Sequence, residues 1–222
     1  MLRVIEIFGS IQGESSYQGL PFAFIRLARC NLRCVWCDTE YSFRGGQEMS
    51  QAQVLETVAS YGVRHACVTG GEPLLQRDES ISLMKALLAR EYTVTLETHG
   101  ALSLEGVPAE VARIVDVKTP EALGKPDDDA FRAMHFHYPN LELLTPLDEV
   151  KIVVSSRSDY EWARTFIREH DLDARCGSVL LSPAWGLVQP SDLAAWVMED
   201  RLPVRLNLQL HKFVWGEGVA GV

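Results

Sequence analysis

The stretch "FAFIRLARCNLRCVWCDTE", residues 22–40, decides the fold and the chemistry expected of this chain. Its first seven residues, 22–28, are apolar apart from one arginine and predict a β-strand. Three cysteines follow with the spacing C-x3-C-x2-C, namely Cys30, Cys34 and Cys37. A structural zinc ion normally takes four protein ligands, so three clustered thiols form an incomplete set. The pattern therefore predicts a metal centre directly after a strand, with one coordination position left open.

Two kinds of metal centre fit these thiols. A Cys3His zinc site would recruit one histidine from elsewhere in the chain, and the candidates are His65, His99, His135, His137 and His211. A four-iron cluster usually takes four cysteine thiolates, so three would leave one iron with an exchangeable position. Such an iron can bind a small molecule through oxygen and nitrogen, which suits catalysis better than electron storage.

Composition limits the partners and the compartment. The chain has 222 residues, 47% of them hydrophobic, which is enough for one sizeable core. Its net charge of −9 disfavours nucleic-acid and membrane partners, since both attract clustered Lys and Arg. No apolar run approaches the roughly 20 residues of a membrane span, and the N-terminus lacks the pattern of a signal peptide. We therefore expect a cytoplasmic protein, with no nucleic-acid or membrane partner, whose thiols stay reduced and free to bind metal.

Strand and helix patterns alternate along the chain. Strands are expected over residues 22–28, 65–70, 93–98, 114–119, 149–155, 177–183 and 204–210. Helices are expected over residues 50–62, 79–91, about 158–170 and 191–200, the first with a capping box formed by Ser50 and Gln53. This alternation predicts parallel strands joined by crossover helices. The Pro-rich and acidic segment at about 120–146 is interpreted as an irregular insertion in a single domain spanning residues 1–222.

Unusual polar residues follow nearly every expected strand. The cysteines follow the first one, and the later segments are "TGGEP" (69–73), "ETHG" (97–100), "DVK" (116–118), "LSP" (181–183) and "QLHK" (209–212). The carboxyl ends of parallel strands converge on one mouth in a barrel, whereas a doubly wound open sheet binds ligands at its switch point. Polar residues on so many strands favour the first arrangement. The expected fold class is thus α/β, a partial (β/α) barrel of mostly parallel strands.

The cysteine motif resembles the signature of the radical S-adenosylmethionine (SAM) superfamily. "VTGGEP" resembles its glycine-rich segment, in which residues without Cβ let backbone approach a cofactor. The resemblance implies a [4Fe–4S] cluster held by Cys30, Cys34 and Cys37, with SAM on the open iron. One electron would cleave SAM to methionine and a 5′-deoxyadenosyl radical that abstracts hydrogen from the substrate. No side chain is then expected to be catalytic, because the protein positions and shields the radical.

Longer segments narrow the resemblance to one family. Residues 7–43, together with "VTGGEPLLQ", "LETHG", "DVKTP", "EVKIVVS", "LSPAW" and "LQLHK", resemble the 7-carboxy-7-deazaguanine synthases of 7-deazapurine (queuosine) biosynthesis. These lyases contract the ring of 6-carboxy-5,6,7,8-tetrahydropterin to give 7-carboxy-7-deazaguanine and ammonia, with Mg²⁺ assisting. The resemblance implies the pterin as substrate, a flavodoxin-like or other reductant, and a homodimer.

The same resemblance assigns residues to the substrate. The substrate-binding candidates are Gln12, Gly13, Glu14, Arg26, Thr69 and His211. A carboxylate and a carboxamide match the alternating donors and acceptors along the edge of a pterin. Arg26 suits the substrate carboxylate, since a planar guanidinium binds it through two hydrogen bonds. Strand alternation also places this arginine on the side of Phe24 and Ala28, where an inward charge is costly unless it meets an anion.

Further residues are assigned to the cofactors. The candidates on the SAM side are Trp36, Cys37, Asp38, Gly71, Asp116, Val117, Lys118 and Ser182. Thr39 resembles the magnesium position of the family, because a hydroxyl is a hard oxygen ligand and the substrate carboxylate would complete the sphere. Asp38 beside it fits a direct ligand or a supporting group equally well. Trp36 fits core packing as well as a cofactor contact.

Two alternatives remain at this stage. A glycyl-radical activating enzyme carries the same cluster motif but acts on a protein loop, and the "IQGE" and "QLHK" segments disfavour it. A non-enzymatic interaction module bearing zinc or a cluster is the second. The tail "FVWGEGVAGV" (213–222) extends beyond the point where family members often end. It could cover the mouth of the site or meet a partner, and any role of the terminal carboxylate stays open.

Overall fold

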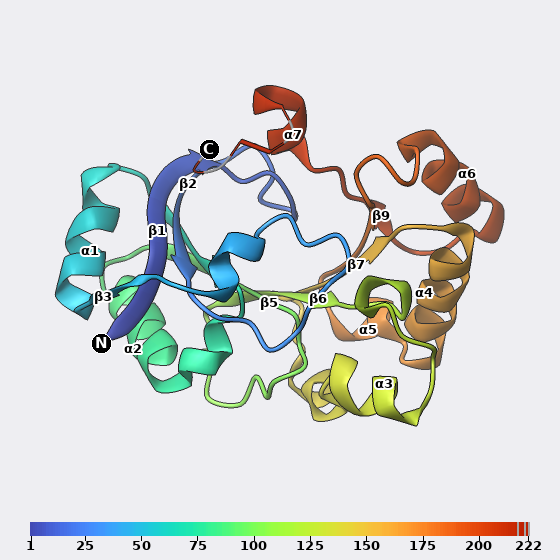
Figure 1. Cartoon of the computed structure of the whole chain (residues 1–222), viewed down its shortest axis with the longest axis horizontal. Coiled ribbons are helices and arrows are strands. Elements are labelled where there is room, and N and C mark those ends of the chain that lie inside the picture. Colours follow the sequence, from blue (N-terminus) through green and yellow to red (C-terminus); the bar gives the residue numbers. More distant parts are fainter. Residues whose placement is uncertain (217, 220, 222) are drawn as a thin grey trace.

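The structure is a computed structural model that describes residues 1–216, 218, 219 and 221 (Figure 1). Within these residues nine strands form one sheet, in the order β3-β1-β2-β4-β5-β6-β7-β8-β9. The strands are β1 (Leu2–Ile11), β2 (Pro21–Leu27), β3 (Gln47–Met49), β4 (His65–Gly70), β5 (Thr93–Thr98), β6 (Ala112–Val117), β7 (Glu149–Val154), β8 (Ser178–Pro183) and β9 (Arg205–Leu206). All neighbours from β2 to β9 are parallel. The sheet is not closed, and this confirms the expected α/β fold of mostly parallel strands.

Helices lie in most connections between the parallel strands, and a loop without a helix joins β5 to β6. They are α1 (Gln51–Ser60), α2 (Arg77–Leu88), α3 (Asp129–His135), α4 (Arg157–Glu169), α5 (Leu172–Arg175), α6 (Pro190–Asp200) and α7 (Leu210–Trp215), with short 3₁₀ turns η1 (Glu40–Phe43), η2 (Pro73–Gln76), η3 (Glu121–Leu123) and η4 (Tyr138–Leu143). The capping box expected at α1 is present, because the Ser50 hydroxyl oxygen accepts a hydrogen bond from the Gln53 backbone amide and Gln53 Oε1 accepts one from the Ser50 backbone amide. None of the described helices is long and apolar enough to cross a membrane.

The two faces of the sheet have different roles. Alternate residues of the strands, such as Ile25, Val68 and Val115, are fully buried in the large apolar core that the helices share. The residues between them point to the other face. Strand register places Arg26 beside Thr69 on that face, and Asp116 beside Lys151. The parallel sheet therefore gathers charged side chains from strands that are distant in sequence.

Three features differ from the sequence expectations. Strands β1 and β3 were not expected, and both pair antiparallel. The strand expected over 204–210 ends after two residues, because Asn207 leaves the sheet to hydrogen-bond with Ser182 and Ser15. The backbone then turns into α7, where the Leu210 amide donates to the Gly13 carbonyl at 2.8 Å. His211 consequently lies on a helix and not at a strand end.

The segment 120–146 is more ordered than an irregular insertion. It contains η3, α3 and η4, and Asp128 caps α3 by accepting a hydrogen bond from the Phe131 amide. The buried Phe131 ring stacks on His135 with ring centroids 4.1 Å apart, and both rings meet Trp162 of α4 edge to face. Aromatic packing holds the segment against the core, which its proline and acidic content did not indicate.

Candidate active site

A cavity of about 670 Å³ lies where the carboxyl ends of the central strands meet the loops after β1 and β2. Most of the residues expected at the site line it, from the substrate, SAM, cluster and magnesium groups alike. These are Gln12, Gly13, Glu14, Arg26, Cys30, Cys34, Trp36, Cys37, Asp38, Thr39, Thr69, Gly71, Asp116, Lys118 and His211. The parallel topology thus brings together residues that are up to about 200 positions apart in the chain.

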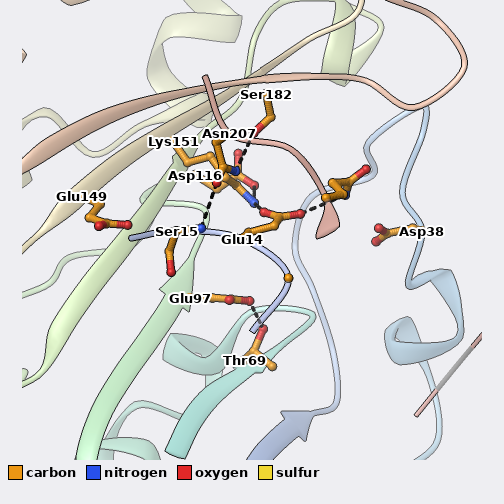
Figure 2. Close-up of polar contacts among 12 residues, drawn as sticks. Glu14, Ser15, Asp38, Thr69, Glu97, Asp116, Glu149, Lys151, Ser182 and Asn207 are labelled. Carbon is orange, nitrogen blue, oxygen red and sulfur yellow. Dashed lines mark hydrogen bonds and ion pairs between the residues drawn. The ribbon is translucent and has the colours of Figure 1, made fainter. Parts of the chain in front are cut away.

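Two expected residues do not line the cavity. The Val117 side chain is fully buried in the core shared with the helices. Ser182 is also buried, and its hydroxyl accepts a hydrogen bond from Asn207 Nδ2 at 2.8 Å. Asn207 Oδ1 in turn accepts from the Ser15 amide at 3.0 Å, as Figure 2 shows. Ser182 therefore anchors the loop that carries Glu14, and its side chain lies behind the cavity wall.

The three cysteines of the motif are free thiols, partly buried, on one loop after β2. A backbone hydrogen bond from the Arg29 amide to the Ser42 carbonyl closes the base of the loop, and one from the Val35 amide to the Ala122 carbonyl holds its middle, each 2.8 Å. Burial raises the pKa of the Cys34 thiol to about 11, so this thiol is protonated at neutral pH unless a metal displaces the proton. All three thiols line the same cavity, so a cluster bound there would have access to each of them.

Of the five histidines considered for a zinc site, only His99 and His211 line the cavity. His99 Nε2 lies 2.9 Å from Asn31 Oδ1 and 3.2 Å from the buried Glu72 carboxylate. It thereby braces the cysteine loop through Asn31. His65 stacks on Phe22 at the opposite ends of the strands.

The glycine-rich segment lies directly under the cysteine loop. A Cβ atom on Gly71 would lie 2.1 Å from the Arg29 carbonyl oxygen and 3.0 Å from Cys30 Cβ. The absent side chain is therefore what lets the two segments touch, a contact with the protein's own backbone that the sequence had not indicated. The fully buried Glu72 accepts hydrogen bonds from Leu74 N, His99 N and Thr98 Oγ1 at 2.8–3.0 Å. It shapes the turn after β4.

Four charged side chains form the floor of the cavity, and Figure 2 shows three of them, Glu14, Asp116 and Lys151. Lys151 contacts Glu14 Oε2 and lies 2.9 Å from Asp116 Oδ2, which is also 2.8 Å from Lys118 Nζ. Burial by itself would raise the pKa of Asp116, but the two ammonium groups outweigh it and lower that pKa. The pKa of Glu14 is lowered in the same way, with Lys151 opposing burial. Both carboxyl groups are thus held ionised in a buried setting.

A second polar group surrounds Glu97 of β5. Its two carboxylate oxygens accept from Gln12 Nε2 at 3.1 Å and from Thr69 Oγ1 at 2.8 Å. The side-chain oxygen Oε1 of Gln12 accepts from the Glu14 backbone amide at 3.2 Å. Glu97 therefore fixes the orientation of two residues expected to bind substrate, a role that its position at a strand end hinted at only weakly.

Arg26 meets an anion of its own chain. Its Nε lies 2.7 Å from Glu6 Oε1, which also accepts from the Tyr41 hydroxyl at 2.8 Å. The rings of Phe8 and Tyr41 lie 5.5 and 5.9 Å from the guanidinium carbon. The sequence argument required an anion near Arg26, and Glu6 was missed because β1 was not recognised as the neighbouring strand.

The residues after Cys37 lie at the mouth. Thr39 Oγ1 is 3.7 Å from Cys37 Sγ, and the largely exposed Asp38 lies 3.7 Å from Lys212 Nζ of α7. The described tail residues Gly216, Gly218, Val219 and Gly221 also line the cavity, so this part of the tail covers the mouth. The terminal carboxylate belongs to Val222, which lies outside the described residues.

Lys151, Asn207 and Glu6 were not anticipated from the sequence. Lys151 could have been found, because "EVKIVV" places one lysine inside an otherwise apolar strand core, as "FAFIRLA" does for Arg26. A charge at such a position is stable only opposite another charge or a ligand. Asn207 carried no comparable signal.

Comparison with known proteins identifies the family. The model of the radical SAM superfamily matches residues 24–121. Membership implies a [4Fe–4S] cluster and SAM, and the three thiols of the cysteine loop and the glycine-rich segment after β4 are of the residue types that these groups require. The chain is 46% identical to 7-carboxy-7-deazaguanine synthase of Koribacter versatilis over the full length of both proteins. It is 41% identical to the enzyme of the same name in Chlorobaculum tepidum, over 100% of this chain and 97% of the relative.

The fold agrees with this assignment. The crystal structure of QueE from Escherichia coli superposes with a TM-score of 0.72 at 22% identity, covering 94% of this chain and 93% of that one. Streptococcus suis SuiB bound to S-adenosylmethionine superposes over 81% of this chain and 48% of its own, with a TM-score of 0.55 at 12% identity. With the sequence identities above, the chain belongs to the 7-carboxy-7-deazaguanine synthase family of the radical SAM superfamily.

Proposed function

We propose that this chain is a 7-carboxy-7-deazaguanine synthase, a radical SAM lyase that contracts 6-carboxy-5,6,7,8-tetrahydropterin to 7-carboxy-7-deazaguanine and releases ammonia. One observation carries the proposal beyond family membership. The three thiols of the cysteine loop and the polar residues suited to a pterin line a single cavity of about 670 Å³. That volume lies within the usual range of about 300–1,000 Å³ for small-molecule sites.

The proposed cofactor side consists of residues from the cysteine loop, the end of β4 and the end of β6. Cys30, Cys34 and Cys37 would hold the [4Fe–4S] cluster, which when bound and reduced supplies the electron that cleaves SAM. Gly71 lets backbone approach the charged methionine end of SAM, and Lys118 supplies a cation for its carboxylate. Asp116 offers a carboxylate oxygen to a hydroxyl or ammonium donor of the same cofactor. Trp36 also lines the cavity.

The substrate side is built around the loop after β1. Glu14 and Gln12 accept and donate along the pterin edge, with Thr69 and His211 adding polar contacts. Arg26 binds the substrate carboxylate with the guanidinium nitrogens that Glu6 leaves free, since only Nε pairs with Glu6. Gly13 keeps room for His211, because a Cβ there would lie 1.9 Å from its Nδ1.

Arg26→Lys is expected to weaken pterin binding by about 10- to 100-fold, because a lysine keeps the charge but loses the planar fork. SAM cleavage without product should persist, since Arg26 lies on the substrate side. Equilibrium dialysis with the pterin measures the effect. Glu6→Gln is the control: it removes the internal partner of Arg26, and pterin affinity should be retained. Equal pterin affinity of Arg26→Lys and the wild type would remove Arg26 from the substrate site.

Thr39→Ala is expected to leave the cluster and SAM binding intact and to lower turnover by about 10-fold or more through the loss of a Mg²⁺ ligand. The proposed site uses the Thr39 hydroxyl and the substrate carboxylate, as the sequence resemblance implies. Turnover of the wild type and the variant is compared across a Mg²⁺ titration. Thr39→Ser keeps the hydroxyl and should retain the response to Mg²⁺. The same Mg²⁺ response in Thr39→Ala as in the wild type would refute the role.

The function itself is tested by an anaerobic product assay. Reconstituted protein is incubated with SAM, dithionite and 6-carboxytetrahydropterin, and the products are followed by mass spectrometry. We expect one 7-carboxy-7-deazaguanine and one ammonia per substrate consumed, and none when SAM is omitted. SAM cleavage without this product, together with glycyl-radical formation on a partner enzyme, would instead establish the activating-enzyme alternative.

The proposed partners are a flavodoxin-like or other one-electron reductant and a second copy of the chain, in the cytoplasm. The homodimer is supported by exposed apolar residues on α7, where Phe213, Val214 and Trp215 are 57%, 54% and 37% exposed. Light scattering of the purified protein at several concentrations measures the oligomeric state. Replacement of dithionite by a reduced flavodoxin in the product assay tests the electron donor.

A further inference from the structure

One ammonium group joins the two halves of the site. Lys151 of β7 lies between Glu14, on the loop after β1, and Asp116 of β6, and its side chain is 11% exposed (Figure 2). The proposed function places Glu14 against the pterin and Asp116 against SAM. Lys151 itself was assigned to neither ligand, although it lines the same cavity.

We propose that Lys151 is a positioning residue shared by the two ligand sites, holding Glu14 for the pterin and Asp116 for SAM with a single charge. The inference rests on the proposed function and adds a residue to it. Its consequence is that loss of one side chain weakens both ligands, although they occupy different parts of the cavity.

The contacts of Glu14 show how firmly it is held. Its Oε2 accepts from Lys151, and its Oε1 accepts from Gln209 Nε2 at 2.9 Å. Two donors on two oxygens fix both the position and the plane of the carboxylate. Each oxygen keeps a second lone pair, so the group can still accept from a ligand. Without Lys151, one oxygen of this buried acid would lose its only charged partner within the described residues.

Asp116 has one oxygen engaged and one free. Its Oδ2 accepts from both Lys118 and Lys151, while its Oδ1 is buried and has no hydrogen-bond partner among the described residues. A buried acceptor without a donor is destabilising and uncommon in folded proteins. A hydroxyl or ammonium group of a bound ligand would supply the missing donor. The two lysines on Oδ2 set the carboxylate plane and so direct Oδ1 toward that ligand.

The charges of the floor explain why one lysine serves both acids. Three carboxylates, Glu14, Glu97 and Asp116, act on Lys151 and raise its pKa well above the usual value, against the opposing effect of burial. Lys118 is the other cation that acts on Asp116. Removal of Lys151 would take away the ammonium group that contacts both Glu14 and Asp116, and Lys118 would remain beside Asp116. Both carboxylates would then become protonated or adopt other side-chain conformations. Either response removes acceptors from both ligand sites.

The chain offers a matched control for a purely structural role. Arg113, near the start of β6, and Asp148, the residue before β7, form another buried ion pair, with Arg113 Nε 2.7 Å from Asp148 Oδ1. Their side chains are 6% and 0% exposed, and neither residue lines the cavity. Arg113→Met therefore breaks an equally buried pair without touching the proposed ligand sites.

The test uses holoenzyme reconstituted anaerobically and kept without reductant, so that ligands bind and no turnover occurs. Equilibrium dialysis gives separate dissociation constants for SAM and for 6-carboxytetrahydropterin. Lys151→Met is expected to weaken each by about 10- to 100-fold, the usual effect of losing a charged hydrogen-bonding partner. Lys151→Arg should restore most of the affinity for both. Arg113→Met should lower the melting temperature and leave both dissociation constants within about 2-fold, the deviation expected for distant sites.

Two outcomes would overturn the shared role: full affinity of Lys151→Met for both ligands, or weakening of only one. If Lys151→Met fails to fold, the double variant Lys151→Gln/Glu14→Gln takes its place. It removes the buried Glu14 charge that the loss of Lys151 would leave without a cation. In that pair SAM affinity should still fall, and unchanged SAM affinity would contradict the inference. A wild-type enzyme that binds both ligands and makes no deazaguanine would contradict the proposed function while leaving the role of Lys151 intact.

Discussion

Cys34→Ala is expected to abolish cluster assembly and SAM cleavage, and to reduce deazaguanine formation to background. Removing a residue that only supports a metal ligand lowers metal affinity or activity by roughly 10- to 100-fold. The loss expected here is larger, because the variant lacks one of the three thiolates that would bind the cluster directly. Cys34 lines the cavity on the same loop as Cys30 and Cys37. Iron and sulfide content, together with the absorbance of the anaerobically reconstituted protein, measure the outcome.

The matched control is Cys176→Ala. Cys176 lies outside the C-x3-C-x2-C motif. Its thiol is buried and donates a hydrogen bond to the Leu172 carbonyl at 3.1 Å. Its loss should lower stability slightly and leave iron content and turnover unchanged. Full iron loading of Cys34→Ala, or loss of iron in Cys176→Ala, would show that the motif does not bind the cluster as proposed.

Gly71→Ala is expected to lower turnover by about 100-fold or more, through a single added methyl group. The new Cβ would lie 2.1 Å from the Arg29 carbonyl oxygen, which is backbone and cannot turn aside as a side chain can. The cysteine loop must therefore move, and Cys30 moves with it. Overpacking of this kind typically costs about 1–3 kcal/mol of stability, and a shift of about 1 Å at the reacting centre costs about 100-fold in rate.

Gly19→Ala separates this clash from the general effect of replacing a glycine. Gly19 has a φ of +86°, and a Cβ there would have no neighbour within 4 Å. It should lose about 1–2 kcal/mol of stability from the left-handed backbone and keep its full iron content and turnover. Thermal unfolding, iron analysis and SAM cleavage are measured for both variants. Iron content and turnover of Gly71→Ala within about 2-fold of the wild type would contradict the close contact between these segments.

Local patterns predicted much of the architecture. The strands at 65–70, 93–98 and 149–155 and the helix after Ser50 are confirmed within a few residues, because alternation, helical period and capping depend on neighbours in the chain. The antiparallel strand β1 was missed, as was the early end of β9. Both depend on contacts between distant segments: β1 pairs with β2 and β3, and β9 gives way to the side-chain bonds of Asn207.

The candidate site divides in the same way. Spacing along the chain was sufficient to place three thiols on one loop and two glycines at the end of a strand, since these features lie within a few residues of one another. The partners of the buried charges could not be foreseen. Glu14 and Lys151 are 137 residues apart, and Arg26 and Glu6 lie on adjacent strands. Such pairs arise only when strand order and register bring two chain segments together. The local sequence therefore determines which residues the cysteine loop carries, whereas the tertiary structure of the sheet determines which charges meet in the cavity.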